Sequence, residues 1–211
     1  MKNLLFCQRL FSERALETAV MLGTNQCLIF DAAKHMLAYR KPQWANSLRI
    51  FELSSYQDIM DKLQMLEDRG IEVPQGTYYI EWAANECRWS ERLKECSAYE
   101  NGGTTFVDLM GLTCKLSKNE YVSLLMEINS LIAKGSSVVF DYREESGEAF
   151  WDGYSYRELE GLLSECGFHI YEHVSSEEMR TQYLVMYNLV NKKTIIPPKD
   201  VCFCLAVKKI R

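Results

Sequence analysis

Short apolar runs alternate with amphipathic stretches along this 211-residue chain, and this alternation restricts the possible folds more than any other feature. The runs are rich in β-branched and aromatic residues, whereas the stretches between them repeat apolar residues every three to four positions. Strands that alternate with helices build a mostly parallel sheet covered on both faces. We therefore predict an α/β fold with one doubly wound sheet. The predicted strands are 27–30, 48–53, 77–82, 104–109, 137–142, 168–173 and 201–207.

The predicted helices have recognisable ends. Gly23 ends a first helix over residues 5–22, and Gly70 ends the helix that Ser54 or Ser55 caps. Ser117 and Glu120 have the spacing of a capping box. The last two strands lack a usual crossover helix, so they can pair antiparallel at the sheet edge. We predict further helices over 42–47, 85–100 and 154–166, a polar helical stretch over 175–187, and a single domain over 1–211, with a helix (1–23) before the core (24–211).

Composition excludes several classes of protein. A net charge of −5 and a pI near 5.4 give no footprint for nucleic acid or an anionic membrane surface. Eight cysteines are scattered without metal-ligand spacing, which indicates reduced thiols, a cytoplasmic location and no metal site. Cys202 and Cys204 share one side of a predicted strand, where core packing is favoured over a metal or redox pair. No signal peptide and no membrane-spanning run are visible.

Acidic residues stand at or near the ends of four predicted strands. They are Glu52, Glu81, Asp108 and Asp141. Carboxyl ends of parallel strands face the ligand crevice, so these side chains are expected to lie on one rim. The stretch 26–53 also has the outline of a nucleotide-binding unit, in which an acid after the second strand accepts hydrogen bonds from a ribose. The turn after the first strand reads Asp31-Ala32-Ala33 and lacks the usual glycines.

Several ordered segments resemble a known family. They include LAYRKPQWANSLRIFEL, QDIMDKLQMLEDRGIEVP, TYYIEW, TTFVDLMGLTCKLSKNEYVSLL, KGSSVVFDY and the tail up to CFCLAVKK. Together they resemble the leucine carboxyl methyltransferase-like family of S-adenosylmethionine-dependent O-methyltransferases, from about Gln8 to Lys209. The resemblance implies a Rossmann-like class I methyltransferase fold with seven strands, the last antiparallel, and S-adenosylmethionine as cofactor.

The resemblance also implies roles for individual residues. Glu52 would hold the ribose hydroxyls and Glu81 the adenine amino group, with Trp82 as a wall for the adenine. Asp108 joins this predicted cofactor site, and Met110 stands where many members place a polar or acidic residue near the cofactor's amino group. Tyr39 and Arg40 keep the AYR that follows the family's glycine loop, and Gly111 keeps a glycine after the fourth strand.

The loop after the first strand departs from the family pattern. Asp31 and Ala33 replace glycines of GAGLDT, where glycine lets the backbone approach the methionine part of the cofactor. The Asp31 carboxylate would repel the cofactor's own carboxylate, a charge that Lys34 is able to offset. Members carry further helices ahead of this point, so the resemblance implies an open site unless another chain covers it.

Three functions remain open at this stage. The first is a cytoplasmic methyltransferase acting on a small molecule or carboxylate. The second is a pseudo-methyltransferase that serves a full-length relative or its own homodimer as a partner or regulatory subunit, without nucleic acid or membrane. The third is a changed chemistry on the same fold. For single residues, Asp31 is a repurposed acid or an unused one, and His35 is a general base or, as we expect, an exposed loop histidine.

Overall fold

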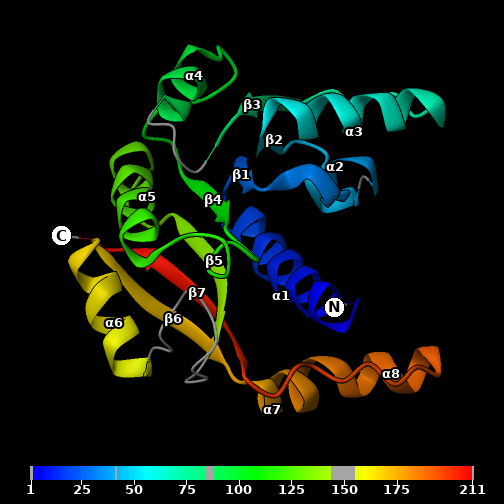
Figure 1. Ribbon diagram of the computed structural model, residues 1–211, viewed down its shortest axis with the longest axis vertical. Helices are drawn as coiled ribbons and strands as arrows, with labels where there is room; N and C mark the ends of the chain where they lie inside the picture. The colour runs from blue at the N-terminus through cyan, green and yellow to red at the C-terminus, as the bar shows by residue number, and fades with distance from the viewer. Residues whose placement is uncertain (1, 41, 84–87, 144–154, 211) are drawn as a thin grey trace.

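A seven-stranded sheet forms the centre of the computed structural model, which describes residues 2–40, 42–83, 88–143 and 155–210 apart from the side chain of Lys34. The strand order is β3-β2-β1-β4-β5-β7-β6 (Figure 1). Neighbouring strands run parallel except β7, which is antiparallel to both β5 and β6. This confirms the predicted doubly wound sheet and its antiparallel last strand. The strands are β1 (Gln26–Phe30), β2 (Arg49–Ser54), β3 (Thr77–Glu81), β4 (Thr105–Asp108), β5 (Ser137–Arg143), β6 (Phe168–Val174) and β7 (Val201–Lys208).

Helices cover both faces of the sheet. On one face, Trp89, Tyr121 and Leu159 of α4, α5 and α6 pack into a core with Phe51 and Phe140 of the strands. On the other, α1 and the π-helical turn Met179–Leu184 pack against a second core, to which β4 and β7 contribute Phe106 and Phe203. The α-helices are α1 (Lys2–Met21), α2 (Leu37–Arg40), α3 (Tyr56–Asp68), α4 (Trp89–Glu95), α5 (Lys118–Leu131), α6 (Tyr156–Glu165), α7 (Ser176–Glu178) and α8 (Val185–Asn191).

The predicted helix ends agree with the observed caps. Gly23 follows α1 with a φ of 103°, in the left-handed region that glycine adopts without steric cost. Ser55 accepts a hydrogen bond from the Asp58 amide at the start of α3, and Ser117 and Glu120 form the predicted capping box of α5. Local hydrogen bonding of serine to the first free amides therefore sets where these helices begin.

Three predicted helices differ from the observed ones. The helix expected over 42–47 is only a 3-10 turn, Gln43–Ala45, and the short α2 precedes it. Of the helix predicted over 85–100, α4 occupies Trp89–Glu95, and residues 85–87 lie outside the described part of the chain. Tyr154, the predicted start of α6, also lies outside it.

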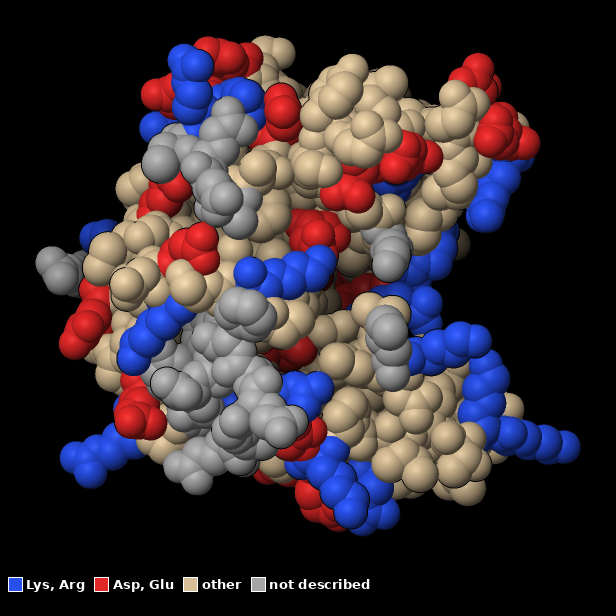
Figure 2. Space-filling model, in the orientation of Figure 1, with Lys and Arg blue, Asp and Glu red and all other residues tan. Residues whose placement is uncertain are grey.

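The helical stretch predicted over 175–187 is present as α7, the π-helical turn and the start of α8. The helical segment continues through α8 to Asn191, and Val185, Met186, Leu189 and Val190 are 43–74% exposed on it. Figure 2 shows this uncharged surface at the lower right, with Lys and Arg side chains at its edge. The segment also packs on α1, since the rings of Phe6 and Tyr187 lie 4.7 Å apart. Among the helices of the described ranges, none has the length and apolarity to span a membrane.

Candidate functional site

The carboxyl edge of the sheet is built from the loop after β1, the ends of β2, β3 and β4, and the side chains that α1 and α3 direct toward them. The strand-end acids predicted to gather on one rim do lie at this edge. Their surroundings differ, however. Glu52, Asp108 and Asp141 are buried, whereas the carboxyl of Glu81 is 42% exposed.

Glu52 forms a buried ion pair with Lys62 of α3. The Lys62 ammonium donates to Oε2 of Glu52 at 2.6 Å, and both side chains are 2% exposed. The same ammonium donates to the backbone carbonyls of Ala32 at 3.0 Å and His35 at 2.6 Å. Burial raises the pKa of Glu52 and lowers the pKa of Lys62, and the opposite charge of each partner offsets part of the other's shift. Lys62 thus joins β2 to the loop after β1.

The loop after β1 keeps a turn suited to glycine although it contains none. Asp31 has φ 55° and ψ 41°, which is left-handed backbone, and the 3-10 turn Ala32–Lys34 follows it. An aspartate tolerates this conformation better than a branched residue because its short polar side chain bonds locally. The Asp31 carboxylate pairs with Lys115, beyond β4, and the side chain of Lys34 lies outside the described part of the chain. Ala33, one of the predicted cofactor residues, lies within the turn and is half-buried.

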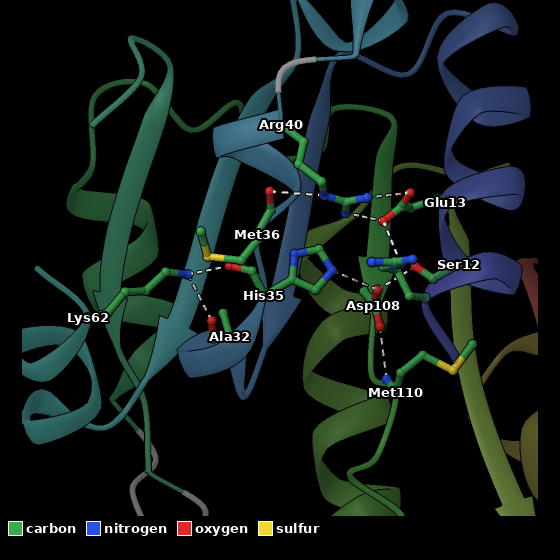
Figure 3. A network of polar contacts seen from close by, with 10 residues as sticks. Ser12, Glu13, Ala32, His35, Met36, Arg40, Lys62, Asp108 and Met110 are labelled. Atoms are coloured by element: carbon green, nitrogen blue, oxygen red, sulfur yellow. Dashed lines mark hydrogen bonds and ion pairs between the residues drawn. The ribbon is translucent and has the colours of Figure 1, made fainter. Parts of the chain in front are cut away.

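His35 lies inside the site, and its expected exposure is wrong. Its side chain is 20% exposed, and its ring points to Asp108, with Nε2 3.9 Å from Oδ2 (Figure 3). Lys62 approaches the same loop from the side opposite to Asp108 (Figure 3). Burial, together with the nearby charges of Lys62, Arg40 and Arg9, lowers the pKa of His35 to about 3. The imidazole is therefore neutral at physiological pH.

Helix α1 holds the two buried acids of β4 and β5. Ser12 donates to the Asp108 carboxylate, and Gln8 donates to Oδ2 of Asp141 at 2.8 Å. Backbone amides complete both sites. Met110 donates to Asp108 Oδ1 at 2.9 Å, and Gly111, with φ 80°, donates to Asp141 Oδ1 at 2.7 Å. Burial raises the pKa of Asp108 to about 6 and raises that of Asp141 as well.

The remaining predicted residues lie around these acids. Arg40 forms a two-pronged ion pair with Glu13 of α1 (Figure 3). Glu81 faces Arg92 of α4 at 3.5 Å. Trp82 is 8% exposed, and its ring packs edge-on against Phe30 with centroids 5.4 Å apart. Arg40 thus stabilises the contact between α1 and the loop, and most of the Trp82 surface belongs to the core.

Sequence reasoning missed the polar partners that hold the acids. Lys62 stands three residues after Ile59 and four before Leu66, so it occupies the buried stripe of its own helix, where a lysine is unusual. Gln8 and Ser12 occupy the buried stripe of α1 in the same way. Polar residues within the apolar stripe of a predicted helix were therefore the sequence signal from which these partners could have been predicted.

Three buried polar atoms have no hydrogen-bond partner among the described residues at this edge. They are Oε1 of Glu52, Oγ of Ser54 and Nδ1 of His35. A buried polar atom without a partner costs free energy, so its presence indicates a place for a ligand or an ordered water. A carboxylate oxygen at the end of β2 suits a hydroxyl donor such as a ribose diol. Within the described residues no group of histidine, cysteine, aspartate and glutamate has the arrangement of a metal site.

The chain is similar in sequence to one methyltransferase family and to a bacterial relative. The model of the leucine carboxyl methyltransferase family matches residues 1–129. YktD of Bacillus subtilis (strain 168), whose name places it among the S-adenosyl-L-methionine-dependent methyltransferases, is 26% identical over 190 residues. The match covers 80% of this chain and 62% of YktD, so the chain spans about six tenths of the length of that relative.

Solved structures with low sequence identity share the fold. A Galdieria sulphuraria protein described as a sarcosine dimethylglycine methyltransferase aligns with a TM-score of 0.62 and 10% identity, over 98% of this chain and 86% of its own. A Nostoc punctiforme protein described as an O-methyltransferase aligns with a TM-score of 0.58 and 14% identity, over 92% of this chain and 55% of its own. At these identities the likeness establishes a Rossmann-like class I methyltransferase fold and nothing about the acceptor.

Proposed function

Because the chain belongs to the leucine carboxyl methyltransferase family, we propose that it transfers a methyl group from S-adenosylmethionine to an oxygen of a small molecule or carboxylate. The observation that carries this proposal is the free oxygen of Glu52. Oε1 is buried at the end of β2 without a partner among the described residues, while Lys62 holds Oε2. One acceptor is therefore fixed in place for a ribose hydroxyl.

The loop after β1 is compatible with the methionine part of the cofactor. Asp31 keeps the left-handed turn, and Lys115 neutralises its carboxylate. Pairing with a lysine reduces the repulsion that a cofactor carboxylate would meet. Near the adenine, Glu81 would accept from the amino group, and the exposed edge of Trp82 would border the ring. Asp108 and Met110 would border the amino-acid end.

Catalysis would rest on positioning and exclusion of water. When bound, the cofactor supplies a methyl group on a positively charged sulfonium, which an oxygen nucleophile attacks in line. The contribution of the protein is to hold the two reacting atoms at attack distance in a site with little water. His35, with a pKa of about 3, binds a proton too weakly to serve as a general base at neutral pH. This favours an acceptor that is already ionised, of which a carboxylate is the simplest case.

A second candidate is a catalytically inactive partner of another methyltransferase, or of a second copy of this chain. Specific contacts favour it. The Lys115–Asp31 ion pair joins the loop after β1 to the segment after β4, and α1 occupies one oxygen of Asp108 and of Asp141. In this case the site would stay closed, and the exposed side chains of α8 would be available to the other protein.

Calorimetric titration with S-adenosylmethionine and S-adenosylhomocysteine separates the two candidates. We expect binding that weakens about tenfold or more in Glu52→Gln, because a hydrogen bond to a buried charge is lost. Glu72→Gln, at an exposed acid outside the site, is the matched control and leaves affinity unchanged. Absence of binding at millimolar ligand would contradict the proposal of an active enzyme and support that of an inactive partner. The native mass of the protein would then show whether it assembles with a second chain.

A further inference from the structure

The buried lysine of α3, Lys62, contacts three parts of the site, namely β2, the loop after β1 and α2. We propose that Lys62 is a positioning residue: it fixes the glycine-free loop after β1 and the Glu52 carboxylate in one arrangement that is ready for a cofactor. The part of this inference that concerns a cofactor rests on the proposed function. The part that concerns the loop and the acid applies to the unliganded chain.

The contacts of Lys62 use its whole hydrogen-bonding capacity. An ammonium group has three protons, and Lys62 has three acceptors at 2.6–3.0 Å, namely Glu52 Oε2 and the carbonyls of Ala32 and His35. The ring of Tyr39 adds a cation–π contact at 5.2 Å. A lysine that is 4% exposed with every donor used is held in a single position. Because the ammonium group is fixed, it restrains the Glu52 carboxylate and the two loop carbonyls that accept its hydrogen bonds.

The loop depends on this cation because hydrogen bonds within the loop do not fully satisfy its own backbone carbonyls. Ala32 is 1% exposed, so without Lys62 its carbonyl would depend on the single bond from the His35 amide at 2.9 Å. Among the described residues, Lys62 is the donor to the His35 carbonyl, which would lose this bond. Asp31 holds the strained left-handed turn just before these carbonyls. Lys62 therefore supplies from outside the loop the restraint that keeps residues 31–35 in this shape.

Glu52 needs the same cation to remain charged in its buried position. Lys62 binds Oε2 and leaves Oε1 for another donor, so the carboxylate is oriented as well as neutralised. Other titratable groups that face this pair are neutral at pH 7. They come from the loop, α2, β3 and β1, and they are His35, Tyr39, Tyr79 and Cys27. Lys62 is thus the cation that offsets part of the rise which burial causes in the pKa of Glu52.

The first test uses the unliganded chain and a pair of substitutions. In Lys62→Met the pKa of Glu52 should rise further, so the unfolding midpoint in urea should fall more steeply with rising pH than in the parent protein. Glu52→Gln in the same chain should remove this added pH dependence, because the group that titrates is gone. Lys94→Met, at an exposed position of α4, is the matched control. A pH profile of Lys62→Met that coincides with the parent profile would overturn the proposal.

Hydrogen exchange and ligand binding complete the test. Peptides covering residues 31–37 should exchange faster in Lys62→Met, while peptides of β4 keep their protection. S-adenosylhomocysteine should bind about tenfold to hundredfold more weakly to this variant. If the parent chain binds no ligand, the proposed function fails, but the pH profile and the exchange rates still decide the role of Lys62. Should Lys62→Met fail to fold, Glu52→Gln alone must show faster exchange at 31–37, and unchanged exchange there would overturn the inference.

Discussion

Asp31 occupies a backbone conformation that most residues avoid. At φ 55° a side chain pays a steric cost of about 1 kcal/mol or more, less for aspartate than for a β-branched residue. The glycine expected from the family pattern is thus replaced by a residue that still permits its geometry.

Substitutions at Asp31 should separate backbone strain from charge. Asp31→Gly should change the free energy of unfolding by less than about 1 kcal/mol, whereas Asp31→Val should lower it by about 1–2 kcal/mol, because valine resists positive φ. Urea unfolding at pH 7 measures both. Lys115→Met removes the exposed ion pair alone and should cost at most about 1 kcal/mol. Equal stability of the glycine and valine variants would contradict a strained turn.

Asp108 should make stability depend on pH. Its pKa is raised from 3.8 to about 6, so the folded protein binds more protons than the unfolded chain in this interval. The stabilisation from the protonated carboxyl is complete below about pH 4 and is lost as pH rises through about 6, on the order of 3 kcal/mol. Asp108→Asn should flatten this decline in urea unfolding between pH 4 and 6.5. A decline as steep in the variant as in the parent protein would assign it to other groups, such as Asp141.

The acids themselves were predictable from the sequence, but their partners were not. Glu52 and Asp108 stand at the ends of apolar runs, and the topology of parallel sheets places such residues at one edge. Their partners, Lys62 for Glu52 and Ser12 for Asp108, depend on how far helices α3 and α1 reach over that edge, which local patterns do not give. His35 shows the limit most clearly. A histidine in a predicted loop looks exposed, and only tertiary packing places it beside Asp108.

Among the helices, α1 has two roles: it covers one face of the sheet, and its polar side chains contact the acids at the strand ends. Its apolar residues Cys7, Phe11 and Leu16 pack on the sheet, and Gln8 and Ser12 on the same buried side reach the acids. The segment around α8 packs in turn on α1 through Phe6 and Tyr187. The two helical segments therefore form one layer over the acids of β4 and β5.

A matched pair of glutamines tests this role of α1. Gln8→Met should lower the free energy of unfolding at pH 7 by about 1–3 kcal/mol, because a buried carboxylate loses a donor. The cost should shrink near pH 4, where Asp141 is protonated more readily. Gln57→Met breaks a similar amide–carboxylate contact, with Asp61, on the exposed face of α3, and should change stability by less than about 0.5 kcal/mol. Equal effects of the two substitutions would show that burial of the Gln8 contact is irrelevant.

Most elements followed from their local patterns, and the exceptions have physical reasons. Strands were predicted to within a residue or two because continuous apolar runs bounded by polar turns have few alternatives. The helix predicted over 175–187 extends to Asn191. Its exposed valine, methionine and leucine residues begin only near the predicted end and continue past it. The helix predicted over 42–47 reduces to one 3-10 turn, because Pro42 suits a first turn but nothing after it continues the pattern.

For the whole molecule, the alternation of strands and helices was sufficient to predict a doubly wound sheet, and the missing crossover before the last strand indicated its antiparallel direction. The spatial order of the strands was not contained in that pattern. The observed order places β1 and β4 at the centre, so the loops that follow them meet at one edge. Asp31 and Lys115, which follow these two strands, meet there.

Lys62 holds the loop after β1 through the backbone of the loop and not through its side chains. Its anchor lies on α3, ten positions beyond Glu52 in the sequence, and the contacts run to backbone carbonyls, which every amino acid provides. The hold on the loop therefore does not depend on which side chains residues 32 and 35 carry. A substitution there that fits the surrounding packing leaves these contacts in place.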